Sequence, residues 1–281
     1  MKKVSGGIFA LAMAFFACSG IYGQQTGLDE ILFNKSEKFQ SYTEKQYSVS
    51  SKFGKYYKKL QSKSVYSFNL DGEPLLIRFY DDEDLCSMSI LYEYDENGRL
   101  VLQRNFNSNE EAWMKIEFSY DEKGRLSVMD TTEENVLKER IIYEYEGEKT
   151  IQSQYDSEGA LENRTIFREK NSVLSQMEVY KKSGELDELY LYSYDAGQNL
   201  VQVDTFDKDQ QVKNTDLFLY DDSGKVREIQ SFDGNGAIYE RKKLKFDEKG
   251  NVTDLYVYSV ADKFGGITNE LKEIFTFTYK Y

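Results

Sequence analysis

The sequence predicts an all-β protein: an antiparallel meander of repeated β-hairpins, forming a coiled or partly wrapped sheet, with a short N-terminal helix. Three observations lead to this fold class. An aromatic residue, an acid and a nearby glycine recur at regular spacing, apolar and polar residues alternate between the recurrences, and proline occurs only at Pro74. Self-similarity marks a repeat architecture, and alternation with period two marks half-buried strands. Scarce proline suits ladders that need nearly every N–H.

Each recurrence has the chemistry of a tight hairpin turn. The acid at the first turn position caps its own backbone, and the glycine accepts the positive φ of a type I turn with a glycine bulge. A strand restarts directly after the glycine, so each unit is strand, turn, strand. The six clearest copies are Tyr94-Asp95…Gly98, Tyr120-Asp121…Gly124, Tyr145-Glu146-Gly147, Tyr194-Asp195…Gly197, Tyr220-Asp221…Gly224 and Phe246-Asp247…Gly250.

The spacing of the glycines sets the size of the unit. Gly72, Gly98 and Gly124 follow one another at intervals of 26 residues, which is two strands and two turns. Residues 65–281 therefore hold on the order of 16 strands. Open twisted sheets of that width curl or split, so we expect a strongly coiled sheet; whether it closes is left open by the sequence.

At these turns the chain resembles a known family. Residues 94–100 read YDENGRL and residues 120–126 read YDEKGRL, which is similar to the tyrosine–aspartate (YD) repeat of Rhs-type proteins. The resemblance covers most of residues 65–281 and implies a β-repeat fold. In the large relatives the repeats coil into a shell around a toxic cargo. This chain is far shorter and has no obvious effector domain, so the resemblance supports the fold better than a cargo function.

The chain divides into three parts. Residues 1–23 are expected to be a signal peptide, with Lys2 and Lys3 before an apolar core too short to span a bilayer. Cleavage after Gly23 competes with a lipoprotein-like box that would leave a lipidated Cys18. Residues 24–64 are a lysine-rich lead-in with a short helix followed by an irregular or strand-like segment, and residues 65–281 are the hairpin-repeat domain. No later stretch is long and apolar enough for a transmembrane helix.

The charge is strongly uneven along the chain. The full chain carries −13. Residues 24–64 contain eight Lys against four acids, whereas residues 65–281 carry −19. An acidic body argues against nucleic acid as a partner and against adsorption to anionic membrane surfaces.

The composition gives no support for an enzyme. Histidine is absent, which excludes Ser–His and Cys–His nucleophilic pairs and histidine-ligated metals. We therefore name no catalytic residue, metal ligand or cofactor. The acids of Asp81–Asp84 and the calcium-like spacings at Asp207–Asp209 and Asp233–Gly236 are interpreted as turn acids, with a carboxylate-dependent glycan hydrolase as an alternative. Cys86 is expected to be a small apolar filler near a strand.

The tyrosines are the strongest indication of binding. There are 23 of them, and many recur at the same place in each unit. Aromatic rings in stripes pack across strands or, when exposed, stack on sugars and dock proteins. The expected partner is an unidentified envelope glycan or protein. The candidate surface comprises Tyr92, Tyr94, Tyr120, Tyr190, Tyr192, Tyr194 and Tyr220.

These observations favour an exported, non-enzymatic β-repeat protein that acts as a binding or scaffold surface in the bacterial envelope, in the periplasm or at the outer membrane or cell surface. The alternative is an outer-membrane β-barrel. Residues 275–281 alternate aromatic and polar residues and end on an aromatic, as the last strand of such a barrel does. Charged residues within the expected strands, among them Arg104, Arg164 and Arg168, argue against that alternative.

Overall fold

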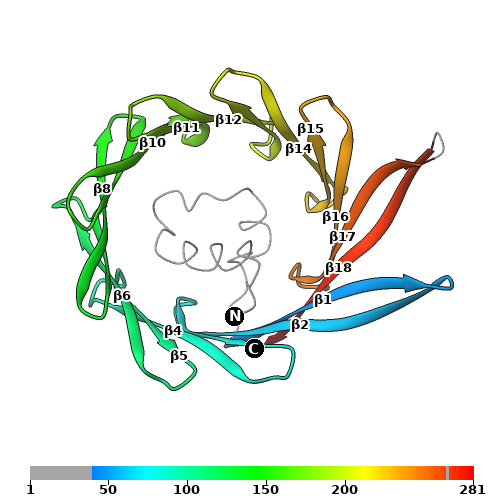
Figure 1. The fold of residues 1–281 in the computed structure, drawn as a ribbon, viewed down its shortest axis with the longest axis horizontal. Coiled ribbons are helices and arrows are strands. Elements are labelled where there is room, and N and C mark those ends of the chain that lie inside the picture. The colour runs from blue at the N-terminus through cyan, green and yellow to red at the C-terminus, as the bar shows by residue number, and fades with distance from the viewer. Residues whose placement is uncertain (1–39, 264–265) are drawn as a thin grey trace.

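The chain forms one closed sheet of 18 strands. The computed structural model describes residues 40–263 and 266–281. Each strand pairs antiparallel with its neighbours in the chain, and β1 (Ser41–Lys52) pairs with both β2 and β18. Figure 1 shows the resulting ring. The predicted all-β antiparallel meander of hairpins is confirmed, and its wrapping is complete: the sheet is a barrel.

The remaining strands follow in chain order around the ring. They are β2 (Lys55–Phe68), β3 (Pro74–Tyr80), β4 (Cys86–Tyr94), β5 (Leu100–Asn107), β6 (Ala112–Tyr120), β7 (Leu126–Glu133), β8 (Val136–Glu146), β9 (Lys149–Asp156), β10 (Leu161–Lys170), β11 (Val173–Lys181), β12 (Leu186–Tyr194), β13 (Leu200–Asp207), β14 (Val212–Tyr220), β15 (Val226–Asp233), β16 (Ile238–Phe246), β17 (Val252–Lys263) and β18 (Gly266–Lys280).

Every element of the described residues is a strand. Within this part of the chain no helix has the length and hydrophobicity needed to cross a membrane. The expected signal peptide, the short helix of the lead-in and Cys18 lie outside the described residues.

Residues 41–64, expected as an irregular or strand-like lead-in, form β1 and most of β2. The sheet therefore continues across the boundary expected after residue 64. β1 closes the ring by pairing over eight residues with β18 and over its whole length with β2. Closure satisfies the backbone groups that the two end strands of an open meander would expose.

The turns have the predicted chemistry. The Asp95 carbonyl accepts the Gly98 N–H at 3.0 Å, and Asp95 Oδ1 accepts the N–H groups of Asn97 and Arg99, both at 2.9 Å. Gly98 has a φ of +74°. Two copies differ from the prediction. After Asp195 the left-handed residue is Gln198, with a φ of +64°, and not Gly197; and the loop at Gly147 has only two residues, because Glu146 pairs directly with Lys149.

Because strands alternate in direction, the turns form two rims. Turns after even-numbered strands, including the Tyr-Asp turns, lie on one rim, which we call the aromatic rim. Turns after odd-numbered strands lie on the other, which we call the distal rim.

The two faces of the sheet differ in burial. Side chains on the concave face of a ring converge, and those on the convex face diverge. Ile77, Ile90, Gln103 and Asn105 have no exposed surface, and the described residues form a single layer, so these side chains lie on the inner wall. Cross-strand pairing joins Ile90 to Ile77 and Asn105, and alternation then assigns the regularly paired residues of each strand. Alternation does not assign residues that the pairing skips at β-bulges, such as Lys213 and Tyr239. The inner wall is apolar and aromatic with a minority of polar residues.

A tyrosine packs at the seam where the ring closes. Tyr42 of β1 is 1% exposed. Its ring stacks on Tyr66 of β2 at 4.2 Å between centroids and lies 5.8 Å from both Phe68 and Tyr279. The aromatic contacts therefore join β18, β1 and β2 on the inner wall.

The turn geometry yields a stability prediction. Gly224 has a φ of +80° and open space around its Cα, so Gly224→Ala should cost about 1–2 kcal/mol through backbone strain alone. Gln210 occupies the equivalent left-handed position with a φ of +59°, so Gln210→Gly should stabilise the protein by about 1 kcal/mol. Urea denaturation measures both changes, with Asp222→Ala in the same turn as control. Equal effects of Gly224→Ala and Asp222→Ala would contradict the strained-turn explanation.

Candidate functional site

All seven candidate tyrosines lie on the inner wall. Register places Tyr92 opposite Gln103 and Val203 opposite Tyr192, both on that face. Tyr92 is buried with 2% of its surface exposed, and the other six are half-buried. The structure therefore brings the predicted stripe to one face, but that face is enclosed by the barrel.

Four of the seven share one structural role. Tyr120 Oη, at the end of β6, donates to the Leu100 carbonyl at the start of β5, at 2.7 Å. The same bond, 20 residues back along the chain, links four tyrosine hydroxyls to carbonyls: Tyr94 to Pro74, Tyr120 to Leu100, Tyr194 to Leu174 and Tyr220 to Leu200. Each bond joins the end of an even-numbered strand to the start of the strand before it, and so links two consecutive turns of the aromatic rim. The recurrence of tyrosine at this position is thus explained by a structural hydrogen bond between adjacent strands.

Two further tyrosines make the same kind of bond and were not among the candidates. We call these six hydrogen-bonded tyrosines the girdle. Tyr145 donates to the Leu126 carbonyl at 2.8 Å, and Tyr279 donates to the Val252 carbonyl at 2.9 Å. The signal for both was present in the sequence, since each ends an even-numbered strand at the repeat position. Phe246 occupies the same position without a hydroxyl.

The acids of the turns are engaged with their own backbone and with arginine. Arg125 Nε donates to Asp121 Oδ2 at 2.8 Å, and the Arg125 guanidinium lies 4.0 Å from the centroid of the Tyr145 ring. The backbone hydrogen bond from Arg125, together with its side chain, lowers the pKa of Asp121. These contacts order the aromatic rim and leave the carboxylate little freedom for general acid catalysis.

The acids considered as hydrolase or calcium groups behave in the same way. Asp81 Oδ1 accepts the Glu83 and Leu85 N–H groups at 3.0 and 2.9 Å. Asp207 and Asp233 each accept two backbone N–H groups two and four residues on. Their positions therefore have a complete explanation in turn formation. Cys86 is exposed, so its expected role as an apolar filler is wrong; its place at the start of β4 leaves it at the distal rim.

The remaining candidates, Tyr190 and Tyr192, stand on β12 beside a polar network. Tyr190 Oη donates to Glu188 Oε2 at 2.5 Å, and Glu188 also pairs with Lys213. Burial raises the pKa of Glu188, but the hydrogen bonds from Lys213 and Tyr190 outweigh it, so the pKa lies below its ordinary value. Glu188 is therefore an anionic acceptor at neutral pH.

A second group of hydrogen bonds lies across β14 to β16, next to Lys213 in the chain. Tyr239 Oη donates to Asn214 Oδ1 at 2.6 Å, and Asn214 Nδ2 donates to Asp216 Oδ2 at 2.9 Å. Ser231 Oγ donates to the other oxygen of Asp216. We call the set Glu188, Tyr190, Tyr192, Lys213, Asn214, Asp216 and Tyr239 the inner polar cluster. It combines aromatic rings with carboxylate, amide and ammonium groups towards the distal rim.

A further carboxylate lies on the inner wall next to the seam. Glu44 Oε2 is 3.5 Å from the Tyr66 hydroxyl, which donates to it. Burial raises the pKa of Glu44 to about 7, and the Tyr66 hydrogen bond opposes this shift. Because the folded-state pKa is above the unfolded value, Glu44 is protonated in the folded chain through the acidic range, and ionisation destabilises the seam as the pH rises towards 7.

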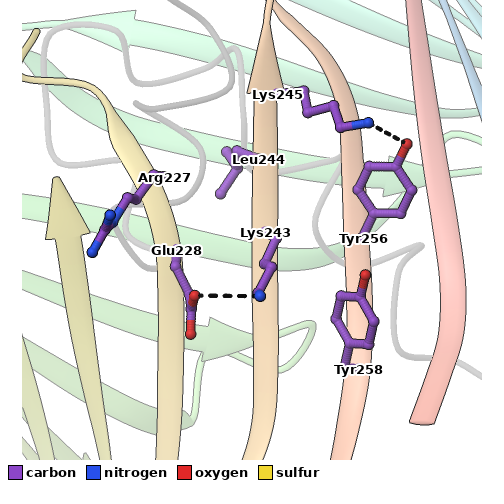
Figure 2. A pocket seen from close by; sticks show the side chains of 7 residues that line it. All are labelled: Arg227, Glu228, Lys243, Leu244, Lys245, Tyr256 and Tyr258. Carbon is purple, nitrogen blue, oxygen red and sulfur yellow. Dashed lines mark hydrogen bonds and ion pairs between the residues drawn. The ribbon is translucent and has the colours of Figure 1, made fainter. Parts of the chain in front are cut away.

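The outer wall has a different character. Figure 2 shows a hollow on β15–β17, with strands of the opposite wall behind it. Lys245 Nζ lies 3.2 Å from Tyr256 Oη, and Lys243 Nζ lies 3.8 Å from Glu228 Oε2. Arg227, Leu244 and Tyr258 complete the lining. Lys243 and Lys245 are already paired with neighbours on the same wall, so we consider the hollow a part of the charged outer surface.

The girdle predicts a graded loss of stability. Tyr120→Phe removes one partly buried hydrogen bond and should cost about 1 kcal/mol in the free energy of unfolding. Phe246→Tyr adds a hydroxyl at a girdle position and should not lower the free energy of unfolding. Tyr155→Phe, a tyrosine on the outer wall, is the control and should change stability by less than about 0.5 kcal/mol. Thermal or urea unfolding of the three variants measures this, and equal losses for Tyr120→Phe and Tyr155→Phe would contradict the structural role of the girdle.

Comparisons with known proteins give weak similarities only. No protein-family model matches the chain, and no curated protein matches it. A porin-like protein from Bacteroides uniformis is 11% identical, with 86% of this chain and 96% of that chain covered and a TM-score of 0.31. A porin-like protein from Bacteroides vulgatus is 10% identical, with coverages of 86% and 98% and a TM-score of 0.27. The TcdB2-TccC3 structure is 13% identical over 76% of this chain and 16% of that chain, with a TM-score of 0.21. The chain is assigned to no family on these similarities.

Proposed function

We propose that the protein is an exported, non-enzymatic barrel of the bacterial envelope whose inner wall binds a glycan. The observation that carries this proposal is the polarity of the two walls. The inner wall holds most of the buried aromatic rings and the inner polar cluster, whereas the outer wall carries ion pairs along the interiors of its strands. The barrel would then stand in water and present its recognition surface to the lumen.

The outer wall is suited to water. Side chains of opposite charge pair across neighbouring strands or, for Lys115 and Glu117, along one strand, and they lie in strand interiors, not only at the rims. The Arg104 and Glu93 side chains of one such pair are 43% and 40% exposed. An Arg or Lys facing the middle of a bilayer costs about 2–4 kcal/mol, so several would outweigh the apolar contacts of these strands. The pairs are Arg104–Glu93, Lys115–Glu117, Arg140–Asp130, Arg168–Glu178 and Lys243–Glu228.

The inner polar cluster has the chemistry of a carbohydrate site. Tyrosine rings pack against the apolar faces of sugars, and carboxylate and amide groups accept and donate hydrogen bonds to hydroxyls. Tyr190 and Tyr192 are half-buried, so part of each ring is accessible. Glu188 and Asp216 supply acceptors within the same cluster. Because these acceptors are carboxylates next to the tyrosine rings, the cluster favours a neutral glycan over an acidic one.

A membrane-spanning outer-membrane barrel is the second candidate, and closure favours it. An even number of antiparallel strands, each paired with its neighbours in the chain, is the topology of such barrels. The two candidates share every strand and differ in what the outer wall contacts. The polarity of that wall leads us to prefer the water-exposed barrel.

The first test separates these candidates. The protein carrying Cys18→Ser, which removes any acyl anchor, is expected in the soluble envelope fraction after a wash with high salt, which releases proteins held at a membrane surface by charge. It should have the same mobility on a gel before and after boiling. Retention in the outer membrane together with a heat-dependent mobility shift would instead support the membrane-spanning candidate.

The second test concerns the ligand. On a glycan array, Tyr190→Ala and Tyr192→Ala should each weaken binding about tenfold, because each removes one stacking ring worth roughly 1 kcal/mol or more. Tyr258→Ala on the outer wall is the matched control and should bind as the unaltered protein does. Loss of binding only in Tyr258→Ala would place recognition on the outer wall. Glycan cleavage abolished by Glu188→Gln would favour the hydrolase alternative.

A further inference from the structure

The hairpin of β1 and β2 extends beyond the barrel. β1 pairs with β18 only as far as Ser48, and β2 pairs with β3 only from Lys63 onward. Residues 49–59 therefore pair within the hairpin alone. In Figure 1 this hairpin projects from the ring beside the hairpin of β17 and β18. We call residues 49–59 the hairpin tip.

The tip exposes large aromatic side chains on a turn. Phe53 is 103% exposed, and Tyr56 and Tyr57 are 62% and 52% exposed. Phe53 also has a φ of +52°, a conformation that glycine would adopt with less strain. A fully exposed phenylalanine at a turn is costly in water and gains from an apolar surface.

The same tip carries a concentrated positive charge. Lys52, Lys55, Lys58 and Lys59 lie within eight residues, and residues 49–59 contain no acid. Lys59 pairs with Asp82 at the base of the tip, and Lys58 lies over the Tyr47 ring at 5.5 Å. This charge contrasts with the balance of −19 in residues 65–281. The tip is thus a cationic and aromatic projection on an anionic body.

We propose that the hairpin tip binds the surface of a membrane that contains anionic phospholipids. Lysines near such a surface are attracted to phosphate headgroups, and aromatic side chains favour the interface between headgroups and acyl chains. Phe53 enters the interface at the apex, Tyr56 and Tyr57 lie at headgroup level, and the lysines contact the phosphates. The acidic body is repelled by the same surface, which orients the barrel with the tip towards the membrane.

A flat membrane fits the tip better than a second protein molecule. The aromatic and basic side chains emerge from a free two-stranded ribbon whose residues 50–59 are all exposed. A partner pocket would need the apolar groups gathered on one face, whereas an interface accepts a projecting apex with cations around it. The acidic body of another copy of this chain is the competing occupant, and the experiment includes it.

The test measures binding of the full exported protein with Cys18→Ser to vesicles of phosphatidylethanolamine and phosphatidylglycerol, by co-sedimentation. Phe53→Ser should weaken binding roughly tenfold. The triple substitution Lys52→Gln, Lys55→Gln and Lys58→Gln should weaken it roughly a hundredfold. Binding of the unaltered protein should fall with added salt and be weaker for vesicles of phosphatidylcholine alone.

Two controls match these variants. Ile267→Ser removes an exposed apolar residue, 62% exposed, from the neighbouring hairpin, and Lys272→Gln removes a cation that pairs with Glu270 on β18. Both should bind as the unaltered protein does, and circular dichroism should show strand content unchanged in every variant. Equal binding by Phe53→Ser and Ile267→Ser would overturn the proposal. So would self-association that the triple substitution abolishes while vesicle binding persists.

Discussion

Closure of the sheet through β1 is the constraint on which the rest of the structure depends. A meander of this length leaves two end strands whose backbone groups face solvent, and β1 satisfies both by pairing with β2 on one side and β18 on the other. Closure creates an inside and an outside. It makes one face of every strand converge and the other diverge, and this geometry decides which residues can be buried without a second layer over them.

The sequence of each strand follows from that geometry. Most inward positions hold apolar or aromatic residues, as in Ile116 and Phe118 of β6, and many outward positions hold charge, as in Lys115 and Glu117. This is the reverse of the arrangement that a lipid-embedded barrel requires. The girdle tyrosines add a second level of order, because each hydroxyl bonds to the previous hairpin and so fixes the repeat along the aromatic rim.

Much of this fold could be predicted from the sequence because its determinants are local. Alternation placed Ile90, Tyr92 and Tyr94 on one face, and the turn acids and glycines marked each hairpin. Closure could not be predicted, because the contact between β1 and β18 joins residues more than 200 positions apart. β1 and β2 also lack a clean alternation, and the register shift after Gln46 gives the physical reason.

The candidate site was predictable in part. The recurrence of tyrosine was visible, but the carbonyl that accepts each hydroxyl is known only once the register of the strands is known. The inner polar cluster draws on β12, β14 and β16, whose residues carry no common motif. The sequence predicts the left-handed turn residue at Gly197, but the structure has it at Gln198. A polar residue in that conformation has no distinctive local pattern, so this position could not be predicted.

The central claim is that charged side chains face water on the outer wall, while the residues next to them along the same strand face the lumen. The most direct measurement is the rate of maleimide labelling of single cysteines on β6, in detergent-free buffer, with Cys18 and Cys86 both replaced by serine. Lys115→Cys should label fast and Ile116→Cys slowly, because these adjacent residues lie on opposite walls. Fast labelling of Ile116→Cys with slow labelling of Lys115→Cys would show that the walls are reversed and would contradict the account.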